Sequence, residues 1–157
     1  MKLINLDKEK EIAIKAAKLA GKLLKEDKNI LNLKINSNPR DTKLKADIKS
    51  EKLILDILNS ESSYPVLAEE TGKTSDDLGD IFWVVDPLDG TANYNRNIPI
   101  CCVSIGLVKN MKPLIGVIFD FNNDDIFVGD NVNNLARLNN KDIKVSDIQK
   151  KTDGVLI

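Results

Sequence analysis

Two short apolar runs in the middle of the sequence each end on acidic residues. Residues 65–68 (PVLA) are followed by Glu69 and Glu70, and residues 81–85 (IFWVV) are followed by Asp86. Runs of this length and composition predict buried β-strands. In open α/β sheets, ligand sites form at the carboxyl ends of the strands. We therefore expect a functional site where these two strands end.

The segment after the second run, residues 86–91 (DPLDGT), places two carboxylates three positions apart. Pro87 biases Asp86 toward an extended conformation, which holds that carboxylate in one direction at the strand end. Gly90 permits a close backbone approach, and residues 91–93 are suited to open a helical turn whose free N–H groups bind phosphate. A simple turn needs one aspartate and the glycine, so the second acid indicates a ligand site.

The sequence has no histidine, and its two cysteines, Cys101 and Cys102, are adjacent. Neighbouring residues in a strand point to opposite faces, so we expect reduced thiols in the core rather than a disulfide. Zinc sites built on sulfur or imidazole, and nucleophile–histidine pairs, are implausible for the same reason. Catalysis would depend on carboxylates, lysine, hydroxyls or a hard metal. An all-oxygen site favours Mg²⁺, and two such ions activate a water molecule without histidine.

The overall charge is nearly balanced, with Lys+Arg 23 against Asp+Glu 24 and a net charge of −1. No global field therefore attracts nucleic acid or an anionic membrane, and we expect neither as a partner. The lysines of the first fifty residues alternate with apolar residues, which is typical of a solvated helix face. No apolar window has the length needed to cross a bilayer, and no signal peptide is visible, so we expect a cytoplasmic location.

Apolar spacing predicts two helices early in the chain. The first spans about residues 8–25 with Asp7 as its N-cap, and the second spans about residues 50–58. The polar segment between them, residues 28–45, contains an Asn-Pro pair and predicts a loop or a weak hairpin. The apolar faces of the two helices are expected at Ile12, Ala16, Leu19, Ala20, Leu23, Leu24, and at Leu53, Ile54, Ile57, Leu58.

Beyond Pro99 the pattern changes to that of an antiparallel meander. Strand-like runs are at residues 102–108, 114–119 and 126–128, with turns at Asn110 and 122–124 and shorter pieces near Leu135 and Ile143. Helices first and an antiparallel run later predict a layered α+β fold, and 157 residues correspond to one domain. Residues 154–157 (GVLI) resemble the start of another strand.

Two alternatives bear on the acids. Asp47 stands just before the second predicted helix, where a cap and a functional carboxylate explain it about equally well.

One phosphatase chemistry uses D-x-D-G-T with its first aspartate as a covalent nucleophile, whereas the spacing here is one residue longer. In an extended strand the added residue turns the second carboxylate to the other face, so we disfavour an aspartyl-phosphate mechanism.

At these residues the chain resembles the inositol monophosphatase family of Mg²⁺-dependent, lithium-sensitive phosphomonoesterases. Ala68 stands where the family has the glycine of a Gly-Glu-Glu-Ser/Thr element, and a lysine stands where threonine or alanine is usual in its Thr-x-x-Asp element. The segments that carry the resemblance are residues 83–94 (WVVDPLDGTANY), 97–99 (NIP), 103–106 (VSIG), 67–71 (LAEET), 45–47 (KAD), 50–54 (SEKLI) and 139–146 (NNKDIKVS).

The resemblance implies a cluster of Mg²⁺ ligands. Glu69, Asp86 and the backbone carbonyl of Leu88 would bind a first ion, and Asp86 and Asp89 would bind a second. Glu70 would support these ligands without contacting the first two ions, or it would bind a third, weaker ion. The resemblance thus implies a cofactor of two or three Mg²⁺ ions.

The resemblance also implies residues for the attacking water and for the phosphate. Asp47 and Thr91 would orient and deprotonate the water, and the backbone N–H groups of Gly90 and Thr91 would bind the phosphate. The partner would be a small phosphorylated substrate, and a homodimer would be in keeping with the family.

The fold that the resemblance implies is a layered α/β sugar-phosphatase-like fold. Residues 1–157 would form its N-terminal metal-binding domain, with two helices packed on a largely antiparallel sheet. A second, C-terminal domain of the family carries a Trp-Asp-x-Ala-Ala-Gly element, and the single tryptophan here, Trp83, belongs to the first signature. We therefore expect a chain truncated before the second domain.

These features lead to two expectations of function. The first is Mg²⁺-dependent hydrolysis of a small phosphate monoester by two-metal activation of water. The Asn93-Tyr94 pair resembles the inositol branch of the family, so inositol monophosphate is favoured over 3′-phosphoadenosine 5′-phosphate or fructose 1,6-bisphosphate. The second is a truncated, catalytically incomplete relative that acts as a metal-binding or assembly module.

Overall fold

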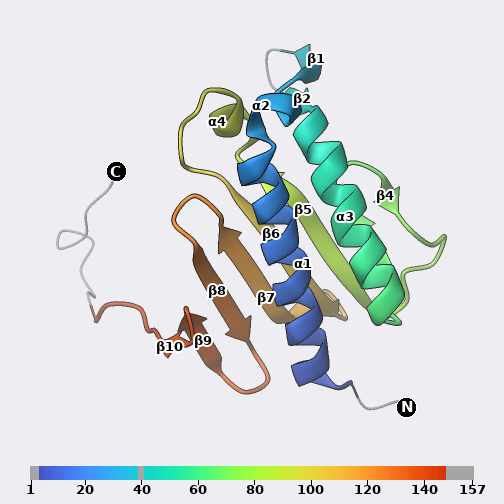
Figure 1. Cartoon of the computed structure of the whole chain (residues 1–157). Coiled ribbons are helices and arrows are strands. Elements are labelled where there is room, and N and C mark those ends of the chain that lie inside the picture. Colours follow the sequence, from blue (N-terminus) through green and yellow to red (C-terminus); the bar gives the residue numbers. More distant parts are fainter. Residues whose placement is uncertain (1–3, 39–40, 148–157) are drawn as a thin grey trace.

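An eight-stranded sheet with helices on one face organises the part of the chain described by this computed structural model, residues 4–38 and 41–147 (Figure 1). Its strand order is β10-β9-β8-β7-β6-β5-β3-β4, and all neighbours are antiparallel except β3 and β5. The bounds are β3 (Val66–Ala68), β4 (Gly72–Lys73), β5 (Ile81–Asp89), β6 (Cys102–Lys109), β7 (Lys112–Asp120), β8 (Asp125–Asp130), β9 (Leu135–Leu138) and β10 (Lys141–Asp142). The predicted α+β class and the meander are confirmed.

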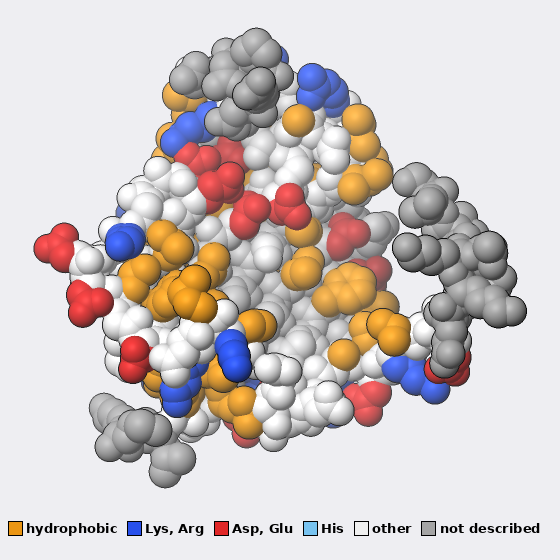
Figure 2. All heavy atoms as spheres, turned by 180° about the vertical axis from the view of Figure 1, so that it is seen from behind, with side chains coloured by type: hydrophobic (Ala, Val, Ile, Leu, Met, Phe, Trp, Pro, Cys, Tyr) orange, Lys and Arg blue, Asp and Glu red, His pale blue; other side chains and the backbone are white. Residues whose placement is uncertain are grey.

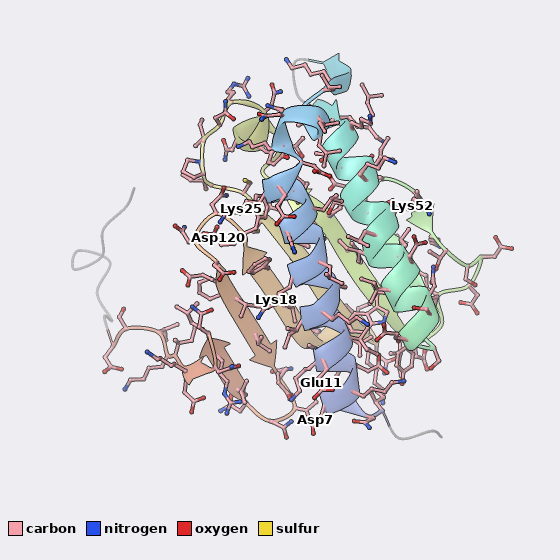
Figure 3. The ribbon with its side chains drawn as sticks, viewed as in Figure 1. Asp7, Glu11, Lys18, Lys25, Lys52 and Asp120 are labelled. Atoms are coloured by element: carbon pink, nitrogen blue, oxygen red, sulfur yellow. The ribbon has the colours of Figure 1, made fainter. Side chains whose placement is uncertain are left out.

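The helices α1 (Leu6–Glu26) and α3 (Lys45–Glu61) lie side by side on one face of the sheet (Figure 1). Alanine-rich turns of α1 face the core, and Lys18 and Lys25 are exposed along it (Figure 3). Two details of the prediction are wrong. The N-cap is Asn5, whose side chain accepts from the Lys8 N–H at 3.1 Å, rather than Asp7 in the first turn. Leu19 is 41% exposed because the buried stripe passes through its neighbours.

Helix α3 begins five positions earlier than predicted, at Lys45 rather than Ser50. Asp47 therefore lies inside its first turn, and its Oδ2 accepts the backbone N–H of Leu44 at 2.7 Å. An acid in this position satisfies one of the free N–H groups at a helix start and favours the helix dipole. The start was missed because Lys45 and Ala46 follow no polar N-cap residue, and the carboxylate of the first turn supplies the capping contact instead.

Between the two long helices, the segment predicted as a loop or weak hairpin contains the short helix α2 (Lys28–Leu31) and a hairpin of β1 (Lys34–Asn38) and β2 (Asp41–Leu44). The short helix α4 (Thr91–Asn95) follows β5 and confirms the predicted helical turn. Its buried Tyr94 donates its hydroxyl to the Leu24 carbonyl at 2.7 Å, which attaches α4 to the end of α1.

The core lies between the helices and the near face of the sheet. Trp83 is fully buried there, and its Nε1 donates to Ser62 Oγ at 3.0 Å. The far face carries exposed apolar side chains, among them Val84, Ile118 and Phe127, and Figure 2 shows acidic side chains gathered above the hydrophobic ones.

Both cysteines are free, as predicted: Cys101 is buried and Cys102 is half-buried at the start of β6. The strand expected near Ile143 ends one residue earlier, at Asp142, and the strand expected at residues 154–157 lies outside the described residues. Among the described residues, no helix has both the length and the apolar character required to cross a membrane.

Candidate metal centre

The parallel pair β3–β5 brings the two acidic strand ends together. Its register pairs Ala68 with Val85, so Glu69 and Asp86 follow at the same edge of the sheet. The Glu69 N–H donates to the Val85 carbonyl at 3.1 Å and continues the pairing by one residue. Parallel strands end at one edge, which is why two acids 17 positions apart in the sequence meet here.

Strand β5 does not end at Asp86, as the sequence had indicated, but continues to Asp89 through a bulge. Asp86 pairs with Ser104 and Asp89 with Cys102, so the bulged strand spans three steps where β6 spans two. Ser104 and Cys102 share a face, and their partners therefore share it too. The expectation that the added residue turns the second carboxylate to the other face is wrong, because the bulge absorbs that residue.

The bulge also fixes the direction of the Asp86 carboxylate. The Leu88 N–H donates to Asp86 Oδ1 at 3.1 Å, while the Leu88 side chain is buried in the core. Asp86 is half-buried and Asp89 is exposed. The Asp86 carboxylate is therefore held in one direction, and both acids remain open to solvent.

Asp47 and Thr91 come together from the first turns of α3 and α4. The Thr91 hydroxyl lies 2.8 Å from Asp47 Oδ1 and 3.0 Å from the Leu88 carbonyl oxygen, so its one proton serves one of two acceptors. Burial raises the pKa of Asp47, against the hydrogen bonds from the Leu44 N–H and Thr91, which lower it. A buried carboxylate that holds a hydroxyl in this way is suited to accept a proton through it.

Glu70 pairs with a positively charged side chain. Its carboxylate forms an ion pair with Lys43 of β2, and this hydrogen bond raises the pKa of the lysine against the effect of burial. Lys43 thus brings a fixed positive charge to the edge of the acidic group.

The acids repel one another electrostatically. Desolvation, and then the charge of Asp86, raise the pKa of Glu69 to about 7, and desolvation also raises the pKa of Asp86. A hydrogen bond between the two carboxyl groups also raises the pKa of Glu69 and lowers that of Asp86, as expected when neighbouring acids share a proton. A divalent cation would take the place of that proton.

These donors fit a hard cation by their chemistry, because all of them are oxygens. Within residues 4–38 and 41–147, however, no three acidic, histidine or cysteine side chains already converge into a finished metal cage. The fit therefore rests on the close Glu69–Asp86 pair and on the neighbouring carbonyl of Leu88.

Sequence reasoning assigned no role to three residues beside this group: Lys43, Ser50 and Glu51. Ser50 and Glu51 are fully buried on α3, at three and four positions after Asp47. Polar residues at this spacing share one helix face. A polar cluster on the buried face of an amphipathic helix was the signal that would have found two of them.

Comparison with known proteins identifies the family of the chain. The family model described as "Inositol monophosphatase family" matches residues 5–157. Inositol monophosphatase 1 of Solanum lycopersicum is 34% identical over 149 residues, which cover 92% of this chain and 54% of that protein. The Nus factor SuhB of Xylella fastidiosa is 36% identical over 149 residues, which cover 93% of this chain and 53% of that protein.

A solved structure of an inositol monophosphatase has a similar fold. The inositol monophosphatase of Anabaena (Nostoc) superposes with a TM-score of 0.78 at 36% identity, covering 92% of this chain and 52% of that one. The chain spans about half the length of the curated relatives it matches. From the matched family model and these relatives, the chain belongs to the inositol monophosphatase family.

Proposed function

We propose that this chain carries the metal-binding part of a Mg²⁺-dependent phosphatase that hydrolyses inositol monophosphate or a similar small phosphate monoester. The observation that carries the proposal is the hydrogen bond between Thr91 and Asp47, which lies next to the Leu88 carbonyl and the acids of the β3–β5 edge. A proton acceptor and a hard-cation site side by side are what a metal-assisted hydrolysis requires.

In this proposal Glu69, Asp86 and the Leu88 carbonyl would hold one Mg²⁺, and Asp86 and Asp89 would hold another. The bulge in β5 supports the arrangement, because it puts Asp86 and Asp89 on one face with Asp86 aimed by the Leu88 N–H. When bound, the ions would supply Lewis-acid activation of a water and neutralisation of phosphate charge. Glu70 is assigned no ion, since Lys43 already pairs with it.

The remaining roles belong to the residues around Thr91. Its hydroxyl orients the attacking water, and Asp47 accepts the proton passed through it, helped by a raised pKa. Gly90, in a left-handed conformation with φ of 85°, turns the chain so that α4 begins at Thr91. The N–H groups of these two residues have no partners within α4 and are proposed to bind the phosphate.

The preference for an inositol phosphate rests on the Asn93-Tyr94 pair and on the names of the relatives. Asn93 Nδ2 donates to the Ile100 carbonyl at 2.8 Å, and the Tyr94 hydroxyl is engaged with Leu24. Both side chains therefore position α4 and the following loop. Any effect on the substrate would come through the shape of that loop.

The test is phosphate release from inositol 1-phosphate by the purified chain, with Mg²⁺ and then Li⁺ titrated. We expect activity that requires Mg²⁺, falls with Li⁺ and is lost in Asp86→Asn. Asp56→Asn on the exposed side of α3 is the matched control and should behave as wild type. Activity that survives in Asp86→Asn would contradict the proposal.

A second candidate function, a metal-binding or assembly module without turnover, is favoured by one observation. Within the described residues, no three acidic, histidine or cysteine side chains converge on one point. Mg²⁺ binding by calorimetry separates the candidates: binding without phosphate release, in a chain that is folded by circular dichroism, supports the module.

A further inference from the structure

One face of helix α3 carries three buried polar side chains in consecutive turns: Asp47 is 1% exposed, Ser50 is 0% exposed and Glu51 is 1% exposed. Burying such groups is costly unless each finds a hydrogen-bond partner. Asp47 belongs to the site already described. Ser50 and Glu51 instead bind backbone groups beside that site.

Glu51 binds the turn that carries the acids of β3. Its Oε2 accepts the backbone N–H of Glu70 at 2.7 Å, and its Oε1 accepts the backbone N–H of Thr71 at 2.9 Å. Both bonds are charge-assisted, which makes them shorter and stronger than bonds between neutral groups. With one amide on each oxygen, Glu51 holds the backbone that follows Glu69.

Ser50 binds the other acidic segment. Its hydroxyl donates to the Pro87 carbonyl at 2.7 Å, in the buried backbone between Asp86 and Leu88. This contact lies at the bulge of β5, where regular pairing with β6 is interrupted. At this point the hydrogen bond from Ser50 holds a stretch of backbone that regular pairing with β6 does not hold.

We infer that Ser50 and Glu51 are positioning residues that fix the two acid-bearing segments against α3. Glu51 sets the place of Glu69, and Ser50 sets the place of Asp86. Together with Asp47, one helix turn thus aligns the segments of three separate elements, β3, β5 and α4. The consequence for Mg²⁺ binding rests on the proposed function, whereas the contacts themselves do not.

The first experiment measures amide hydrogen exchange in Glu51→Gln. A glutamine amide has one acceptor oxygen, so at least one of the two N–H groups loses its partner. We expect exchange at Glu70, at Thr71 or at both to be about ten-fold faster or more, with other α3 contacts unchanged. Asp56→Asn makes the same chemical change on the exposed side of the same helix and should leave both amides unaffected.

The second experiment measures Mg²⁺ affinity by calorimetry, with Mg²⁺ alone as the ligand. We expect Glu51→Gln to weaken Mg²⁺ binding about ten-fold or more, as for residues that orient metal ligands without contacting the metal. Asp56→Asn should bind Mg²⁺ as wild type does. Ser50→Ala should also weaken binding, while leaving exchange at Glu70 and Thr71 unchanged. If both variants bind Mg²⁺ more weakly but only Glu51→Gln changes exchange, each acts through its own local contact and not through a general loss of stability.

Mg²⁺ affinity within two-fold of wild type in folded Glu51→Gln would overturn the inference. If Glu51→Gln does not fold, Glu51→Asp keeps the charge, shortens the side chain by one methylene and must show the same two losses. If wild type itself binds no Mg²⁺, the proposed function fails, and unchanged exchange at Glu70 and Thr71 would then overturn the positioning role on its own.

Discussion

Gly90 shows how much of the site depends on one residue. Its φ is 85°, and a Cβ at this position would lie 2.7 Å from the Ile100 carbonyl oxygen. Gly72 has a similar φ of 76° but has nothing within 4 Å of its virtual Cβ. The two glycines therefore share the conformational requirement and differ only in the space around them.

We predict that Gly90→Ala lowers the free energy of unfolding more than Gly72→Ala does. Both variants lose about 1–2 kcal/mol for a side chain in a left-handed conformation. Gly90→Ala loses roughly 1–3 kcal/mol more, because the loop after α4 must move away. Urea unfolding of the two variants measures the difference, and equal losses would show that the contact with Ile100 carries no strain.

Lys43 decides how much negative charge the acidic group presents. We predict that Lys43→Met strengthens Mg²⁺ binding roughly five-fold, equivalent to about 1 kcal/mol, because it frees the Glu70 carboxylate from its ion pair. Lys52, on the outer side of α3 (Figure 3), pairs with Asp56 and provides the matched control Lys52→Met. Calorimetry that finds the same affinity in all three proteins would rule out this role of Lys43.

The contact between α1 and β7 depends on a glycine in the helix. A Cβ on Gly21 would lie 2.5 Å from the Phe119 ring and 2.9 Å from Phe121 Cβ. The absence of a side chain at this position lets the helix approach the sheet closely, which offsets the low helix propensity of glycine.

We predict that Gly21→Ala destabilises the chain by about 1–3 kcal/mol, even though alanine is the better helix former by about 1 kcal/mol. Phe119→Leu in the same chain should recover part of the loss by making room. Thermal and urea unfolding of the two single variants and the double variant test this as a cycle. A double variant whose losses simply add would contradict the proposed clash.

The link between α1 and β8 is electrostatic. Asp130 is buried on β8 and accepts from Lys10 Nζ at 2.8 Å and from the Asn133 amide at 2.6 Å. Desolvation raises the pKa of Asp130, but the hydrogen bonds from Lys10 and Asn133 outweigh it and lower the pKa to about 2.

The lowered pKa predicts a loss of stability in acid. Because the folded pKa lies below the ordinary value of 3.8, the stabilisation is present above pH 3.8 and is lost as the pH falls toward 2. It amounts to about 2 kcal/mol. The difference in unfolding free energy between wild type and Asp130→Asn should therefore shrink between pH 5 and pH 2. A difference that does not vary with pH would exclude the ionised contact as its cause.

At the scale of the whole molecule, we predict that the acidic group makes stability depend on pH and on Mg²⁺. The metal-free folded chain holds a proton on Glu69 with a pKa of about 7, above its ordinary value of 4.5. The contribution of Glu69 to the free energy of unfolding is therefore most favourable below pH 4.5, falls as the pH rises toward 7 and then levels off. Mg²⁺ should raise the melting temperature most above pH 7, where that proton has left.

Melting temperatures from pH 4.5 to 8, with chelator or with Mg²⁺, measure this dependence. Glu69→Gln should flatten the metal-free profile, while Glu26→Gln on the exposed end of α1 should keep it. A wild-type profile with no fall between pH 4.5 and 7, or one shared by Glu69→Gln, would show that the repulsion between the acids does not affect folding.

Much of this architecture could be predicted because its signals are local. Apolar spacing located α1 to within two residues at each end and α3 except for its first and last turns, and the alternation and turns after residue 99 predicted the meander. The two short apolar runs predicted β3 and β5 with acids at their ends. Helix and strand periods depend on neighbouring residues, so a single sequence carries them.

The sequence by itself determined which kinds of side chain are available for chemistry: oxygen donors at strand ends, no histidine, and a glycine before a helical turn. Only the tertiary structure decided how they combine. The bulge that keeps Asp86 and Asp89 on one face, the pairing of Lys43 with Glu70, and the contacts of Ser50 and Glu51 join residues brought together by sheet register and helix packing. Such contacts join residues distant in sequence or depend on register, so no local period of the chain encodes them.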